Sequence, residues 1–238
     1  MSDRRPATLV LVHGAWHGAW CWDLLRDELA GLGVASVAPD LPSTASGGAL
    51  SDDVATVRQA LDSVDGPAVL VGHSRGGFVI AEAGDHPAVT HLVFLAAPMN
   101  APDEPPHDMA QWAPAGSAEA LVALYASTDL DEHGRRVIRP DAAGGLFYHD
   151  CPAELADAAT ARLRPQPTSG FEQHVYAWRD RPTTYIVCTD DRALHVPLQR
   201  YFAARASTGM ATIASSHSPF MSRPAELAAV LAGVARAG

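Results

Sequence analysis

The feature that most constrains the fold is a five-residue turn, Gly72-His73-Ser74-Arg75-Gly76, placed between a strand pattern and a helix pattern. The apolar run 68–71 predicts a buried strand, and residues 77–83 are compatible with a helix. Glycines two positions before and after Ser74 allow the backbone to turn sharply enough to present the serine hydroxyl. The segment therefore predicts a strand, a strained turn and a helix whose first N–H groups point toward developing negative charge.

Five further apolar runs have the length and continuity of buried strands. They are residues 7–12, 34–38, 89–96, 183–188 and 210–214. Continuous apolar runs are typical of parallel strands that helices cover on both faces. Together with 68–71 they predict an α/β fold with about six mostly parallel strands and right-handed crossovers. Helices are expected at about 20–30 and 51–64, the second with Ser51 as its N-cap.

The pattern changes between Pro98 and Pro182. Several prolines open this segment, and short helical stretches follow at 118–126 and 152–163. We predict a core formed by residues 1–98 and 183–238. Residues 99–182 are expected to be a helical lid, inserted before the last two strands and folded over the carboxyl edge of the sheet.

Composition indicates which classes of partner are excluded and in which compartment the protein is expected. The chain has 238 residues, of which 47% are hydrophobic, so one sizeable core is expected. A formal net charge of −10 argues against nucleic acid, whose phosphates need cationic partners. No run approaches membrane-spanning length, no signal-peptide pattern opens the chain, and three widely spaced cysteines indicate no disulfide framework. We therefore expect a cytoplasmic protein without a membrane partner.

No cofactor or metal is expected. The sequence contains no lysine, which excludes Schiff-base chemistry, pyridoxal phosphate anchoring and a P-loop lysine. His13 and His17 are four residues apart, but no glutamate accompanies them in a H-E-x-x-H pattern and they lie in a glycine-rich loop.

Ser74 needs a base and an orienting acid before its hydroxyl can act as a nucleophile. His217 lies in a loop after the last predicted strand, where the chain order Ser, acid, His requires the base. The acid is expected after the preceding strand, where Asp190 and Asp191 are adjacent. Consecutive side chains point in opposite directions, so the residues alone leave open which aspartate faces His217.

The loop after the first predicted strand supplies the second half of an oxyanion hole. Gly14 allows the backbone to approach a substrate, and Ala15 can offer its N–H alongside that of Arg75. Both expected donors are backbone groups.

Four motifs, at residues 11–22, 72–77, 187–191 and 216–218, resemble the α/β-hydrolase superfamily, and most of all its branch of plant methylesterases, hydroxynitrile lyases and small bacterial hydrolases. The resemblance implies an α/β-hydrolase fold and places the acid on Asp191. The lyases of this branch carry threonine where this chain has Gly14, and lysine where it has Ser218. Both lyase residues are missing, which favours hydrolysis.

The resulting hypothesis is a serine esterase that acts on a small, partly apolar molecule. Ser74 attacks the ester carbonyl, His217 transfers the proton and Asp191 holds the imidazole. Five aromatic residues are expected to contact the substrate: Trp16, Trp112, Phe147, Tyr148 and Phe220. Thioester or lactone hydrolysis, acyl transfer and carbon–carbon cleavage remain alternatives on the same triad, as does a small-molecule receptor with a hydrolase shell. The sequence does not indicate an oligomeric state.

Overall fold

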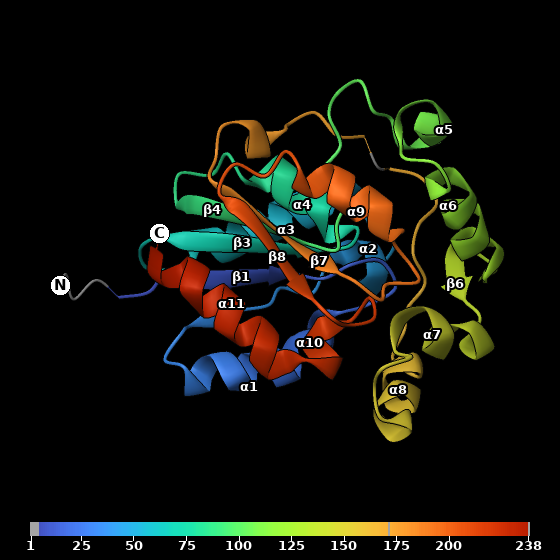
Figure 1. Cartoon of the computed structure of the whole chain (residues 1–238), viewed down its shortest axis with the longest axis horizontal. Helices are drawn as coiled ribbons and strands as arrows, with labels where there is room; N and C mark the ends of the chain where they lie inside the picture. Colours follow the sequence, from blue (N-terminus) through green and yellow to red (C-terminus); the bar gives the residue numbers. More distant parts are fainter. Residues whose placement is uncertain (1–4, 171, 238) are drawn as a thin grey trace.

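A computed structural model describes residues 5–170 and 172–237 and contains a six-stranded parallel sheet (Figure 1). In spatial order the strands are β2 (Ser36–Val37), β1 (Thr8–Val12), β3 (Ala68–His73), β4 (Val89–Leu95), β7 (Thr183–Cys188) and β8 (Gly209–Ile213). All neighbouring pairs are parallel. The predicted α/β class and the six predicted strands are confirmed.

Helices cover both faces of the sheet because successive strand residues point to opposite sides. Leu9 and Leu11 of β1 belong to one core with α1 (Asp23–Gly31) and α11 (Pro224–Ala237). Val10 and Val12 belong to the second core, with α3 (Leu50–Asp62), α4 (Gly76–Ala83) and α9 (Val196–Ala203). Figure 1 shows α1 and α11 on one side of the sheet and α4 and α9 on the other. Three short elements complete this part: η1 (Ala19–Trp22), α2 (Pro42–Ala45) and α10 (Pro219–Ser222).

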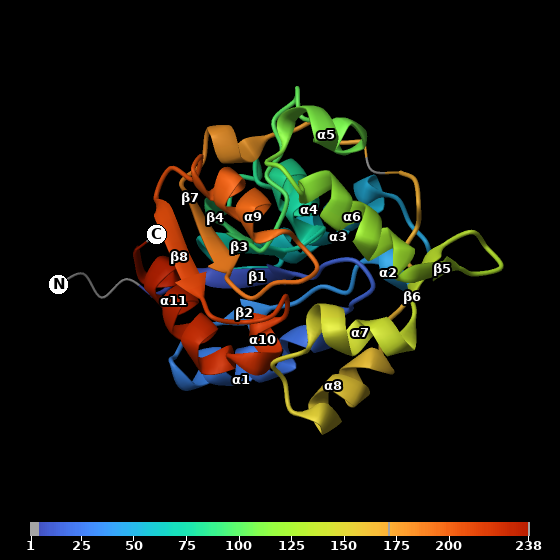
Figure 2. The ribbon, with the colours of Figure 1, turned by 45° about the vertical axis from the view of Figure 1, so that its right-hand side comes forward.

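Residues 99–182, hereafter the inserted segment, connect β4 to β7 at one end of the sheet (Figure 2). Its elements are η2 (Pro106–Asp108), α5 (Met109–Trp112), α6 (Ser117–Ala126), β5 (Thr128–Leu130), β6 (Arg136–Ile138), α7 (Pro140–Phe147), α8 (Ala153–Thr160) and η3 (Ala177–Arg179). The helical stretches expected near 118–126 and 152–163 are present as α6 and α8. The antiparallel β5–β6 hairpin was not predicted, because its three-residue strands are too short for a periodic signal.

The start of α3 differs from the prediction. The helix begins at Leu50, its N-cap residue is Ala49, and the Asp52 carboxylate accepts the Ala49 N–H at 2.8 Å. Ser51 is therefore not the N-cap. Asp53, in the first turn of α3, is fully buried and takes part in the site described below.

No helix within residues 5–170 and 172–237 combines the length and the apolar composition needed to cross a bilayer.

Candidate active site

Ser74 occupies the turn between β3 and α4 in a left-handed backbone conformation, with φ of 50°. This conformation is uncommon for residues other than glycine, and it persists only where the surrounding structure enforces it. The flanking glycines have no room for a side chain: a Cβ on Gly72 would lie 2.6 Å from the Gly76 carbonyl oxygen, and one on Gly76 equally close to that of Val12. The predicted strand, turn and helix are therefore present, and the turn requires both glycines.

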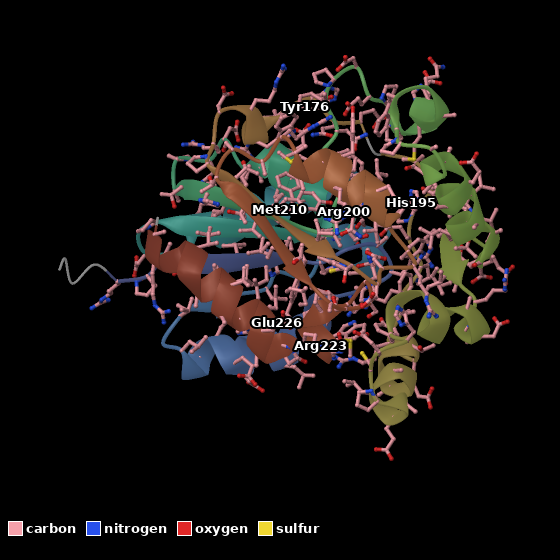
Figure 3. The ribbon with its side chains drawn as sticks, in the orientation of Figure 1. Tyr176, His195, Arg200, Met210, Arg223 and Glu226 are labelled. Carbon is pink, nitrogen blue, oxygen red and sulfur yellow. The ribbon has the colours of Figure 1, made fainter. Side chains whose placement is uncertain are left out.

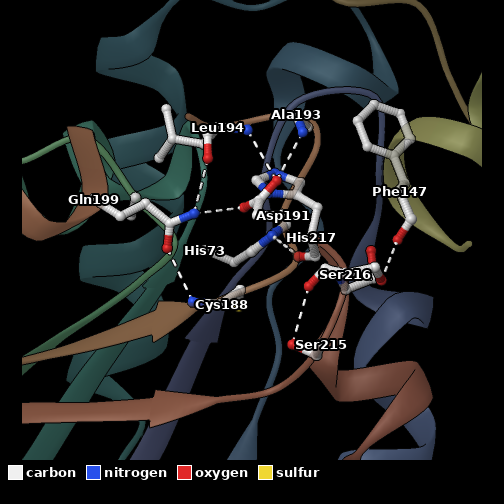
Figure 4. A network of polar contacts seen from close by, with 12 residues as sticks. His73, Phe147, Cys188, Asp191, Ala193, Leu194, Gln199, Ser215, Ser216 and His217 are labelled. Atoms are coloured by element: carbon white, nitrogen blue, oxygen red, sulfur yellow. Dashed lines mark hydrogen bonds and ion pairs between the residues drawn. The ribbon is translucent and has the colours of Figure 1, made fainter. Parts of the chain in front are cut away.

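His217 and Asp191 meet at the carboxyl ends of the last two strands (Figure 4). The His217 Nδ1 lies 2.7 Å from the Asp191 Oδ2, and both side chains are buried. Asp190, the other aspartate considered, is exposed to solvent. His217 and Ser74 line the same cavity, so the structure brings the predicted nucleophile, base and acid to one place.

The loop after β1 lies directly against Ser74. A Cβ on Gly14 would lie 2.8 Å from the Ser74 Cβ, so glycine allows the two segments to approach this closely, and a side chain here would have to displace one of them. Ala15 and Arg75, the predicted oxyanion donors, both line the cavity beside Ser74.

Two buried histidines fix this loop. The His13 Nε2 accepts the Leu41 N–H at 3.0 Å, so the proton lies on Nδ1, which donates to the Gly14 carbonyl oxygen at 2.9 Å. His17 Nδ1 donates to the Ala15 carbonyl oxygen at 2.8 Å. Burial lowers the pKa of His13 to about 4 and that of His17 to about 3, so both rings are neutral at pH 7.

Neither histidine is arranged as a metal ligand. The remaining nitrogen of His17, Nε2, accepts the Tyr148 hydroxyl at 2.8 Å, so both nitrogens of each ring are hydrogen-bonded. In the described part of the chain, no group of three histidine, cysteine or acidic side chains could hold a metal ion.

Arg75 forms a buried ion pair that connects the Ser74 turn to α3. Its Nη1 lies 2.6 Å from the Asp53 Oδ2, and the other carboxylate oxygen accepts the Ser43 N–H at 2.9 Å. The side chains of the pair are 8% and 0% exposed. Sequence reasoning missed this role for Asp53, because its partner is 22 residues away and no local pattern connects them.

The cavity beside Ser74 has a volume of about 240 Å³ and a mainly apolar wall. Trp16 and Phe147, both predicted, contribute to it and stack with ring centroids 5.9 Å apart. Leucines of α6 and residues around α9 complete the apolar wall: Leu121, Leu124, Leu194, Leu198 and Phe202.

Three of the five aromatic residues expected to contact a substrate do not line the cavity. Trp112 packs near Tyr201 of α9 and donates its indole N–H to the Pro105 carbonyl oxygen at 3.0 Å. Tyr148 is buried against His17. Phe220 lies in the core, 4.8 Å from Trp22 between ring centroids. Tyr148 and Phe220 are thus buried in the core, and Trp112 is partly buried against it.

Comparison with known proteins gives the wider relationship. A model of the alpha/beta hydrolase family matches residues 9–230, most of the chain. The chain belongs to the alpha/beta hydrolase family. The matched residues include the strand-turn-helix segment around Ser74 and the loop that holds His217.

Relatives within the family cover nearly the whole chain. Norfluorocurarine synthase 2 from Strychnos sp is 31% identical over 92% of this chain and 91% of its own length. Methylesterase 7 from Arabidopsis thaliana is 27% identical over 99% of this chain and 98% of its own length. The crystal structure of a pyrethroid hydrolase from Sphingobium faniae JZ-2 superposes with a TM-score of 0.82 at 26% identity, covering 97% of this chain and 98% of that one. The predicted resemblance to the methylesterase branch is confirmed.

Sequence reasoning missed several polar residues of this hydrolase site. Asn100, Ser117, Arg136, Gln166 and His195 line the cavity among the apolar side chains. His195 stands immediately before α9 (Figure 3), and its Nδ1 lies 3.1 Å from the Ser117 hydroxyl of α6. Gln199 of α9 contacts the Asp191 carboxylate. They form no motif, because five separate segments carry them: the loop after β4, α6, β6, the loop after α8, and α9 with the residue before it.

Proposed function

We propose that this protein is a carboxylic-ester hydrolase that uses Ser74 as nucleophile, His217 as base and Asp191 as orienting acid. The observation that carries the proposal is the 2.7 Å contact between His217 Nδ1 and Asp191 Oδ2, buried beside a cavity that Ser74 also lines. Relatives named methylesterase, methyl jasmonate esterase and pyrethroid hydrolase support ester hydrolysis.

The proposed reaction has two halves. The Ser74 hydroxyl oxygen attacks the ester carbonyl carbon while His217 Nε2 accepts the hydroxyl proton, and the alcohol leaves with that proton. Water then attacks the acyl-serine, giving its proton to His217, and the acid is released as Ser74 is restored. Asp191 stabilises the imidazolium formed in each half.

The N–H groups of Ala15 and Arg75 are the proposed donors to the oxyanion of each tetrahedral intermediate. Removing one such donor typically raises the barrier by ~2.7–4 kcal/mol, so these amides should supply a large share of the catalysis. His13 and His17 hold the carbonyl groups of Gly14 and Ala15, which orients the donor loop.

The inserted segment is the proposed lid and contributes much of the substrate pocket. Its α6 contributes apolar side chains, and Phe147 at the end of α7 stacks on Trp16. A pocket of this composition suits a small ester with an apolar acyl or alkyl group.

The test is Ser74→Ala with 4-nitrophenyl butyrate as substrate. The variant should lose at least ~10³-fold in kcat, because the nucleophile is removed, and should no longer form an adduct with a fluorophosphonate. Ser63→Ala, on the exposed end of α3, is the matched control and should keep the wild-type rate. An unchanged rate in Ser74→Ala would refute the proposal.

A different reaction on the same three residues is the second candidate, because the relative at 31% identity is named a synthase. Comparing kcat/KM for matched esters, thioesters and lactones separates these reactions. Tight binding of a ligand without any product would instead favour a receptor.

A further inference from the structure

The Asp191 carboxylate accepts four hydrogen bonds. Its Oδ1 accepts the N–H groups of Ala193 at 2.7 Å and Leu194 at 2.9 Å. Its Oδ2 lies 2.7 Å from His217 Nδ1 and accepts Gln199 Nε2 at 2.8 Å (Figure 4). A carboxylate offers about four acceptor positions, so all are occupied. The orientation of the carboxylate toward His217 is therefore determined by the three other donors.

Among those three donors, Gln199 alone uses its side chain. It is fully buried, and its amide oxygen and both of its amide N–H donors are hydrogen-bonded. The Oε1 accepts the Cys188 N–H at 3.0 Å, at the end of β7, while Nε2 donates to the Leu194 carbonyl oxygen at 2.9 Å as well as to Asp191. A flipped amide would oppose N–H to N–H and oxygen to oxygen, so these partners fix its orientation.

Gln199 and His217 bond the same carboxylate oxygen. The amide occupies one acceptor position of Oδ2, which leaves the other for the imidazole. Because the amide is neutral, it orients the carboxylate without placing a second positive charge beside it, so the carboxylate charge remains available to an imidazolium.

We propose that Gln199 is a positioning residue of the active site, holding Asp191 Oδ2 toward His217 Nδ1. This inference rests on the proposed function, since it assigns a role within the same triad. Gln199 is not among the described residues that line the cavity, so it acts through Asp191 and not on the substrate.

The first test is Gln199→Leu, which removes both N–H donors and the acceptor at similar volume. We expect kcat to fall by roughly 10–100-fold, a typical cost of losing a hydrogen bond that orients a residue of the site. KM and the affinity for a competitive inhibitor should be unchanged. The low-field ¹H signal of the His217 Nδ1–H should shift in this variant. Arg200→Ala, the exposed neighbour on α9 labelled in Figure 3, is the control and should change none of these.

A double-mutant cycle separates positioning from a general structural role. If Gln199 acts through Asp191, Gln199→Leu should change kcat by no more than about twofold in an Asp191→Asn background. The inference would be overturned if Gln199→Leu lowered kcat by the same factor in the wild-type and Asp191→Asn backgrounds. A wild-type kcat in the single variant Gln199→Leu would also overturn it.

Gln199→Glu provides the same test if the leucine variant does not fold. Its carboxyl keeps the volume and an acceptor for the Cys188 N–H, but it adjoins the buried Asp191 carboxylate and shares a proton with it, so Asp191 no longer presents a fully charged acceptor to His217 and kcat should again fall with KM unchanged. A wild-type kcat here also overturns the inference. The proposed function fails separately, through an active Ser74→Ala variant.

Discussion

Gly14 and Ser74 approach so closely that a Cβ on Gly14 would lie 2.8 Å from the Ser74 Cβ. The same added atom would lie 3.1 Å from the His73 Nδ1 and 3.2 Å from the His73 carbonyl oxygen. The loop after β1 and the turn after β3 are thus held together at the point where the proposed oxyanion donors lie on either side of Ser74.

Replacing Gly14 with alanine should therefore impair catalysis. The added carbon has to push the loop away from Ser74, and a displacement of about 1 Å at a reacting group can cost ~10²-fold in rate. The measurement is kcat/KM for 4-nitrophenyl butyrate. Gly31→Ala is the control, because a Cβ there meets nothing within 4 Å. Equal rates in the two variants would show that the loop is not held as described.

Asp191 and Asp190 should differ sharply in their effect on turnover. Asp191→Asn replaces the acceptor for His217 Nδ1 with a group that can present N–H, which favours the wrong tautomer and typically lowers kcat by ~10⁴-fold. Asp190→Asn changes an exposed side chain and should leave kcat within about twofold of wild type. Steady-state kinetics of the two variants measure this contrast. Similar losses would mean that the acid has been misassigned.

Asp53→Asn should destabilise the fold. The substitution removes the negative charge that lies 2.6 Å from the buried Arg75 guanidinium, and breaking a buried pair in this way costs about 3–5 kcal/mol of unfolding free energy. Urea unfolding measures the change. Asp52→Asn is the matched neighbour: Asp52 is exposed and accepts only the N–H at the start of α3, so its loss should cost about 1 kcal/mol or less. An equal cost for the two variants would contradict this account of the ion pair.

Acidic conditions should destabilise the protein through its buried histidines. In the unfolded chain a histidine has an ordinary pKa near 6.5, whereas burial lowers the pKa of His13 to about 4 and of His17 to about 3. Between these values the unfolded chain binds protons that the folded protein does not. The unfolding free energy should therefore fall as pH drops from about 6.5 to 4, by up to about 1.4 kcal/mol per pH unit for each histidine.

Urea unfolding at a series of pH values tests this expectation. His17→Gln keeps an acceptor for the Tyr148 hydroxyl but cannot titrate, so the slope between pH 6.5 and 4 should become shallower. His133→Gln, on an exposed loop, should keep the wild-type slope. An unchanged slope in His17→Gln would argue against a neutral buried His17.

Leu121→Trp should reduce the length of acyl group that the enzyme accepts. Leu121 lines the cavity from α6, and a larger ring there would fill part of its approximately 240 Å³. We expect kcat/KM for 4-nitrophenyl octanoate to fall at least tenfold relative to that for the acetate, since lost apolar burial costs about 0.8 kcal/mol per methylene. Val122→Trp, at the exposed neighbouring position, is the control. An unchanged chain-length profile would place the acyl group elsewhere.

The sequence by itself determined the sheet and the identity of the catalytic candidates. Continuous apolar runs, such as those of the strands that end at His73 and Cys188, indicate strands that are buried on both faces. Each run can be recognised from the residues of its own strand. The glycines around Ser74 encode a turn that other residues could not adopt. His217 was located by its order in the chain, and the family resemblance selected Asp191 over Asp190.

Only the tertiary structure decided which residues surround these candidates. Gln199 on Asp191, Asp53 on Arg75 and the burial of Tyr148 against His17 all depend on where separate elements pack, and none has a periodic or spacing signal. The same holds for the aromatic residues near the site: Trp16 and Phe147 line the cavity, whereas Phe220 lies in the core. Apolar character predicts that a ring is buried, but packing across distant segments decides what it is buried against.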